Sequence, residues 1–336
     1  GDPDIVDSTP AIATNTPVLA KLAKTYVGPE NETATGPNFP RQYVVTLDVA
    51  TGQTLTNVHL RDFLPNNVQF ISASVVGNGT TLVTDLGTPS TSTPGGNVLR
   101  LLNTVVGTAA AADATLTIDF YVPYRDASNA IILDSDPSYG PPRTLSNQAQ
   151  DAYSWTPLDP RDGLVTLDPA QTVTYSGPIA RSIAIQKSVG IATDTTPTGT
   201  SPRDTLQYTL DFQISDFYGL DDIIITDLFS DGQAFDPTFT PTLLINGNSY
   251  TLSALGFGAA NYTVSGTNPT YPSTGPFSNP HGQGRTQIVF RVSDEMIRRG
   301  QNGQMVGGLV NMASGGHVAS PGHGPTTGQI RFRTRV

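Results

Sequence analysis

The sequence has no cysteine, and lysine and methionine each occur only three times among its 336 residues. Without cysteine the chain can form no disulfide, thiolate nucleophile or cysteine-ligated metal site. No apolar run approaches the ~18 residues that a membrane-spanning helix needs, so we predict no membrane insertion in this segment. The formal net charge is −10 and basic residues do not cluster, which predicts that the chain does not bind nucleic acid.

Charged residues make up only 14% of the chain, which argues against coiled coils and long surface helices. Glycine and proline are abundant instead, with 33 and 27 residues, and both favour turns. Short segments rich in β-branched and aromatic residues, such as YVVTLDV, TLTIDFYV and TQIVFRV, lie between the turn signals. This pattern predicts an all-β protein built from β-sandwiches.

The sequence contains two copies of one unit. Residues 24–48, KTYVGPENETATGPNFPRQYVVTLD, match residues 187–211, KSVGIATDTTPTGTSPRDTLQYTLD, in length, in their Gly/Pro/Thr-rich loop and in their final Thr-Leu-Asp. Two shorter matches follow at a nearly constant offset of about 164 residues, 57–70 with 221–235 and 145–149 with 309–313, and a third, 117–122 with 287–292, has a slightly larger offset. A constant offset over several segments indicates a tandem duplication.

We therefore predict two tandem Ig-like or adhesin-type β-sandwich domains, residues 1–178 and 179–336. Residues 1–16 are expected to form an entry linker or a strand of the first domain. The final segment, TGQIRFRTRV, alternates apolar and polar residues as a strand does. We expect the whole chain to be a segment of a longer array.

Each unit supplies one lysine early, one aspartate on a middle strand and one asparagine on a late strand. These candidate site residues are Lys24, Asp48 and Asn147 in the first unit, and Lys187, Asp211 and Asn311 in the second. The lysines and asparagines alternate with apolar residues, so we expect them to face the core. Burial lowers the pKa of a lysine and raises the pKa of a neighbouring aspartate.

This combination suits the formation of an amide. A neutral lysine amine is a nucleophile, and a protonated aspartate can polarise an asparagine carboxamide. Attack would release ammonia and leave an isopeptide bond, with Asp48 and Asp211 as proton shuttles. The sequence therefore predicts the cross-links Lys24–Asn147 and Lys187–Asn311 as a single-turnover reaction, and no other enzyme activity.

Two interpretations of the lysines stay open beside this one. They could form buried salt bridges without covalent closure. Lys21 is a rival nucleophile in the first unit, but the second unit has Ala184 at the corresponding position. Asp62 and Asp227 stand at the ends of segments read as strands, and we interpret them as residues that cap turns.

The order of lysine, acid and asparagine resembles that of Gram-positive pilin and adhesin domains with intramolecular isopeptide bonds. The use of aspartate resembles their collagen-adhesin type A class. The segment YVVTLDVATGQTLTNVHLRDFLPNNVQF also resembles the DUF11-type repeats of large bacterial surface proteins, although the second unit, TDLFSDGQAF, lacks the proline of RDFLPNNVQF. The resemblance implies an extracellular, cell-surface stalk or scaffold whose partners are neighbouring repeats of the same surface protein.

Two other classes of function stay open. The long loops at 77–96 and 265–284 would suit an adhesin module that binds a host or matrix ligand, such as a glycan. An enzyme would need a cleft with further perturbed acids, and the sequence has no nucleophile elbow, zincin motif or phosphate-binding glycine loop.

We predict no cofactor and no metal. The acidic segments at 134–138 and 221–222 are the best candidates for calcium, but neither has the spacing of an EF-hand loop. His317 and His323 lie six residues apart in a Gly/Pro-rich loop, and we interpret them as exposed loop residues rather than metal ligands.

Overall fold

The computed structural model describes residues 18–29, 31–79, 83–133, 144–157, 161–195, 197–230, 232–252, 262–266, 286–300, 303–310 and 324–336. Strands dominate these residues, and one short helix, α1 (Val292–Arg298), is described beside them. The predicted all-β fold class is confirmed.

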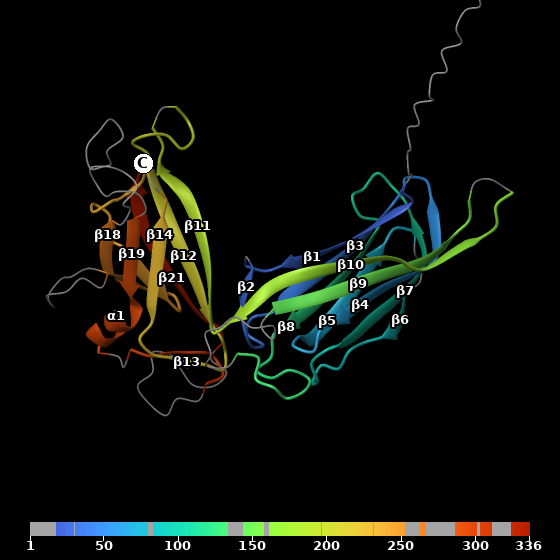
Figure 1. The fold of residues 1–336 in the computed structure, drawn as a ribbon, viewed down its shortest axis with the longest axis horizontal. Helices are drawn as coiled ribbons and strands as arrows, with labels where there is room; N and C mark the ends of the chain where they lie inside the picture. The colour runs from blue at the N-terminus through green and yellow to red at the C-terminus, as the bar shows by residue number, and fades with distance from the viewer. Residues whose placement is uncertain are drawn as a thin grey trace, which may run out of the picture.

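The first half is a sandwich of two sheets around one hydrophobic core (Figure 1). The four-stranded sheet has the order β1 (Ala20–Val27), β3 (Arg41–Val49), β8 (Ala114–Tyr121) and β5 (Gln69–Gly77). The facing six-stranded sheet has the order β2 (Glu32–Ala34), β10 (Val165–Arg181), β9 (Thr144–Trp155), β4 (Thr54–Leu64), β7 (Gly96–Val106) and β6 (Val83–Gly87). Every second residue of β3 is buried, because one face of the strand packs against this core.

The second half has its own core. Its larger sheet has the order β11 (Ile183–Thr193), β12 (Thr205–Ile214), β21 (Thr326–Arg335), β16 (Thr242–Ile245) and β17 (Asn248–Thr251), and β15 (Ala234–Phe235) also pairs with β21. A second sheet contains β14 (Ile224–Phe229), β19 (Thr286–Arg291) and β18 (Tyr262–Gly266), and β13 (Gly219–Leu220) pairs with β20 (Met305–Val306).

The antiparallel pair β1–β3 of the first half corresponds to the antiparallel pair β11–β12 of the second. Other segments that match in sequence do not pair with corresponding strands. Strand β8 lies beside β3, whereas β19 lies beside β14 in the other sheet of its half. A short strand with one buried face fits either sheet of a sandwich, so the apolar alternation of 117–122 and 287–292 does not determine their partners.

The change from one sandwich to the other occurs at Ser182, between β10 and β11. The predicted boundary at 178/179 lies inside β10. Direct hydrogen bonds join the halves beside this point: the N–H of Thr35 donates to Ser215 Oγ at 2.7 Å, and the side chain of Asn38 donates to Asp216 at 3.0 Å. Strand β10 runs along the first half and leads into β11 at the junction (Figure 1).

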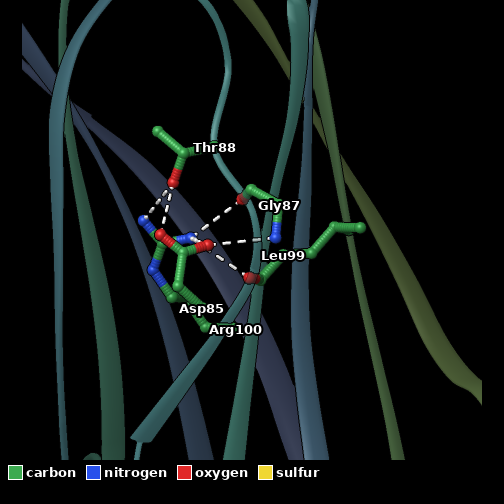
Figure 2. Close-up of polar contacts among 5 residues, drawn as sticks. All are labelled: Asp85, Gly87, Thr88, Leu99 and Arg100. Atoms are coloured by element: carbon green, nitrogen blue, oxygen red, sulfur yellow. Dashed lines mark hydrogen bonds and ion pairs between the residues drawn. The ribbon is translucent and has the colours of Figure 1, made fainter.

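A buried arginine holds the outer edge of the six-stranded sheet (Figure 2). Nη1 of Arg100, on β7, donates to Asp85 Oδ1 at 2.7 Å and to the carbonyls of Gly87 and Leu99 at 2.9 and 3.1 Å. Nη2 donates to Thr88 Oγ1 at 3.1 Å. These contacts fasten the irregular end of edge strand β6, where the register shifts between Asp85 and Gly87.

Replacing Arg100 with alanine should lower the free energy of unfolding of the first half by about 1–3 kcal/mol, because the end of β6 loses several hydrogen bonds from a charged donor. Urea denaturation followed by circular dichroism measures this change. Arg331→Ala, at an exposed position of β21, is the control and should change stability by no more than about 0.5 kcal/mol. Equal effects of the two substitutions would contradict the structural role of Arg100.

Candidate functional site

The core of the first half contains a lysine, an aspartate and an asparagine in contact. Lys24 comes from β1, and Asp62 and Asn147 come from β4 and β9 of the facing sheet. The Lys24 side chain is 1% exposed, and those of Asp62 and Asn147 are fully buried. Lys24 Nζ contacts Asp62 Oδ2, and Asn147 Nδ2 lies 2.9 Å from Asp62 Oδ1. One carboxyl group therefore contacts both the amine and the carboxamide.

The alternation of the strands explains why these polar groups point inward. On β4, Asp62 shares the buried face with Leu60 and Leu64. On β9, Asn147 shares the buried face with Leu145 and Ala149. Residues two positions apart lie on the same face of a strand, so the buried apolar residues on either side place the polar residue in the core.

Burial determines the protonation of this site. It lowers the pKa of the Lys24 amine and raises the pKa of the Asp62 carboxyl, while the attraction between the two groups opposes both changes. Desolvation is the larger effect on each residue. Both changes are in the direction of a neutral amine beside a protonated acid, which is the state that a nucleophilic lysine requires.

The carboxamide of Asn147 has one unused acceptor. Its Oδ1 is buried and has no hydrogen-bond partner among the described residues. A 180° rotation of the carboxamide exchanges Oδ1 with Nδ2 and brings the oxygen to hydrogen-bonding distance of Asp62 Oδ1. A protonated Asp62 can then donate to it and polarise the carboxamide carbon.

Aromatic rings lie against both lysines. Lys24 Nζ is 4.4 Å from the centroid of the Tyr43 ring, and Lys187 Nζ is 4.7 Å from that of Tyr208. Each ring can attract the protonated form of the amine through its π face. The sequence interpretation missed these tyrosines, although a Gln-Tyr dipeptide at 42–43 and again at 207–208 was an available signal.

The structure does not bring Asp48 or Asp211 to the lysines. Asp48 lies on the outer face of β3 and is paired with Lys21, whereas Lys24 is paired with Val45. Asp211 accepts a hydrogen bond from Gln329 Nε2 at 2.6 Å instead.

The carboxyl groups beside the lysines belong to Asp62 and Asp227, which the sequence interpretation had taken for turn caps. The assignment of the proton shuttle to Asp48 and Asp211 is therefore corrected. Its physical cause is strand alternation, which directs both side chains away from the core.

The second half repeats the lysine–aspartate contact in a more open setting. Lys187 Nζ donates to Asp227 Oδ1 at 2.7 Å and to the carbonyl of Leu228 at 3.3 Å. The Lys187 side chain is 35% exposed and that of Asp227 9% exposed. Asn311 lies outside the described residues, so the second cross-link stays a prediction.

A further buried acid follows Asn147 on the same strand. Asp151 is fully buried, and its Oδ1 and Oδ2 accept hydrogen bonds from the backbone N–H and Nε2 of Gln171 at 2.6 and 3.2 Å. Burial raises the pKa of Asp151 to about 6, and the hydrogen bonds from Gln171 oppose this rise.

Within the described residues, His, Asp and Glu form no group of three or more that could hold a metal. The calcium candidate at 134–138, the pair His317 and His323, and most of the loop 265–284 lie outside those residues.

No helix in the described ranges is long and apolar enough to cross a membrane. A shallow groove along β11 is lined by small residues together with Val189, Ile191, Gln207 of β12 and Arg333 of β21.

No protein-family model and no curated protein matches the sequence, so the DUF11 resemblance stays a prediction. Among solved structures, the chain is similar to the major pilin SpaD of Corynebacterium diphtheriae, with 14% identity, a TM-score of 0.28 and coverage of 70% of this chain and 48% of the pilin. The chain thus spans about half the length of that pilin.

Two other solved structures are similar at the same level. The collagen-binding domain of a Staphylococcus aureus adhesin has 7% identity, a TM-score of 0.24 and coverage of 48% of this chain and 98% of the domain. The T6 backbone pilin of Streptococcus pyogenes has 10% identity, a TM-score of 0.25 and coverage of 70% and 61%. TM-scores this low carry no functional argument.

The raised pKa of Asp151 predicts a specific dependence of stability on pH. Well below pH ~4 the carboxyl is protonated in both the folded and the unfolded chain, so its burial does not change stability with pH there. As the pH rises towards about 6, the unfolded chain releases this proton first, and the folded state loses on the order of 3 kcal/mol.

Asp151→Asn removes this titration but keeps an acceptor for Gln171. The free energy of unfolding of the wild type and the variant is measured in urea at pH 4 and at pH 7.5. The value of the variant relative to that of the wild type should be about 2–3 kcal/mol higher at pH 7.5 than at pH 4. A difference between the two proteins that stays constant over this range would contradict the assignment.

Proposed function

We propose that this chain is a structural stalk segment of a bacterial cell-surface fibrous protein or adhesin, in which each half is locked by a self-formed Lys–Asn isopeptide bond. The observation that carries the proposal is the buried contact of Asp62 with both Lys24 and Asn147. A lysine in a sandwich core is unfavourable as a charged group, and covalent closure removes that charge permanently.

The reaction balances without a co-reactant. The neutral Lys24 amine attacks Cγ of Asn147, whose oxygen accepts a hydrogen bond from the protonated Asp62. Asp62 then gives its proton to the leaving amide nitrogen, which departs as ammonia, and takes a proton from the attacking nitrogen. The product is an amide between Nζ of Lys24 and Cγ of Asn147, and Asp62 returns to its starting state.

Asp62 acts here in place of the Asp48 that the sequence suggested. Asp227 would have the same role toward Lys187 and Asn311 in the second half. Its contact with Lys187 supports this extension. The groups are held by the folded strands, and such proximity allows a slow reaction to proceed once per chain.

The bond would suit a load-bearing protein. It would join β1 to β9, which belong to opposite sheets, and close a loop of about 120 residues. By the loop-entropy relation used for disulfides, such a closure stabilises the fold by on the order of 5 kcal/mol. Tension entering before β1 would pass through the cross-link to β9 and leave residues 25–146 unloaded. The bond would thus give a chain without cysteine a covalent cross-link that reducing agents cannot cleave.

A fibrous role is supported by the tandem organisation and by the hydrogen bonds that join the halves at Thr35, Asn38, Ser215 and Asp216. The sequence resemblance to surface-protein domains points the same way, and it implies an extracellular location with neighbouring repeats as partners.

The intact mass of the denatured protein tests the proposal directly. Each bond expels one ammonia, so two bonds predict a mass about 34 Da below that of the sequence. Asp62→Ala should restore about 17 Da, because the first half then lacks its proton shuttle. Asp48→Ala is the matched control and should leave the mass deficit unchanged, since Asp48 faces away from the site.

A wild-type mass equal to the sequence mass would exclude the isopeptide mechanism and leave the lysines as partners in buried salt bridges. Loss of the deficit in Asp48→Ala, but not in Asp62→Ala, would contradict the assignment of the shuttle.

A further inference from the structure

The side chain of Gln171 connects the two sheets of the first half close to Lys24. Its Oε1 accepts the backbone N–H of Leu22 at 3.0 Å, and its Nε2 donates to the backbone carbonyl of Ala20 at 3.1 Å. Gln171 belongs to β10 in the six-stranded sheet, whereas Ala20 and Leu22 belong to β1 in the other sheet. The carboxamide therefore forms hydrogen bonds with one backbone N–H and one backbone carbonyl of β1, as a peptide group of a neighbouring strand would.

Asp151 fixes the orientation of Gln171. Its carboxyl oxygens accept the backbone N–H of Gln171 at 2.6 Å and the Nε2 of Gln171 at 3.2 Å. Nε2 thus has an acceptor for each of its two protons, one on Asp151 and one on Ala20. Asp151 and Gln171 are also register partners in the β9–β10 ladder.

This connection is near both reacting residues along their strands. Leu22 precedes Lys24 by two residues on the same face of β1, a distance of about 7 Å. Asp151 follows Asn147 by four residues on the same face of β9, a distance of about 13 Å. Among the described strands β1 pairs with β3 and with no strand of the sheet of Asn147, and the Gln171 side chain hydrogen-bonds the β1 backbone from that sheet.

The corresponding position of the second half has a similar contact from a different source. The backbone N–H of Ile185, two residues before Lys187, donates to Glu32 Oε2 at 3.3 Å. Glu32 belongs to β2 of the first half and also binds Arg181 at 2.8 Å. Each lysine strand is therefore held at the same backbone position, but only the first is held by Gln171.

We infer that Gln171 and Asp151 are positioning residues for the Lys24–Asn147 cross-link, because they hold β1 in the register that keeps Lys24 against Asp62 and Asn147. This inference rests on the proposed function. A displacement of about 1 Å at the reacting atoms can slow such a reaction by up to ~100-fold, so a loosened β1 should react slowly even in a folded chain.

The test measures the rate of cross-linking in the full chain. The protein is made in a short cell-free pulse, chased at a temperature well below unfolding, quenched in denaturant and digested with trypsin. Cross-linking joins residues 22–41, which contain Lys24, to residues 144–161, which contain Asn147, and mass spectrometry follows this branched peptide over time. The peptide that contains Lys187 reports the second half in the same sample.

Gln171→Met keeps the size of the side chain but removes its hydrogen bonds, and it should slow the first cross-link at least about tenfold. Asp151→Ala should do the same, and Asp151→Asn, which keeps only one of the two acceptors for Gln171, should react at an intermediate rate. Val173→Ala is the matched control, because it weakens the core packing of the same strand without touching these hydrogen bonds. It should react at close to the wild-type rate, and so should exposed Gln148→Ala. The second half should be unaffected in every variant.

Two results would overturn the inference: a wild-type rate in Gln171→Met, or an equal slowing in Gln171→Met and Val173→Ala, which would indicate a general loss of stability. Failure of the proposed function gives a different result, since no branched peptide would then form in the wild type.

Discussion

The Asp62 carboxyl group joins the two sheets of the first half through buried polar atoms. It contacts an amine from one sheet and a carboxamide from the other, and all three groups are buried. A buried group of this kind is tolerated only where its partners are present, so the packing of β1 against β4 and β9 depends on it. The same burial shifts the lysine and the acid toward their neutral forms, which links the stability of the fold to its reactivity.

The sequence alone supported much of this picture. Alternation and turn residues predicted the all-β class, and the duplication drew attention to Lys24, Lys187 and Asn147. The acid was assigned wrongly for a physical reason. Asp48 stands an odd number of residues from Val45, the buried partner of Lys24, so it must face outward. Applying strand alternation to the aspartates would have excluded Asp48 and kept Asp62 between Leu60 and Leu64.

A second error came from the alignment of the repeats. Aligning the two repeats on their shared Thr-Leu-Asp matches Val45 with Tyr208. In the structure, however, Lys24 pairs with Val45 and Lys187 pairs with Leu210, so Val45 corresponds to Leu210. The true register pairs Tyr43 with Tyr208, the two rings beside the lysines. A shift of two residues keeps every side chain on its original face, so hydrophobic pattern cannot detect it. The contact of Gln171 with β1 was also beyond the sequence, since it joins residues that are far apart in the chain.

The two halves repeat the lysine–aspartate contact in different surroundings. Lys24 is enclosed, while Lys187 is one-third exposed and its strand is held by Glu32 from the first half. The first half therefore has its own positioning contacts, and the second depends in part on the junction. In a tandem array, such dependence would couple the closure of one domain to the folding of its neighbour.

The most direct measurement is a crystal structure of the protein at a resolution of about 1.5 Å or better. Our account predicts continuous density between Lys24 Nζ and Asn147 Cγ at the ~1.33 Å of an amide bond, with Asp62 in contact with that amide. Separate side chains at a hydrogen-bonding distance of about 2.7 Å or more would contradict it.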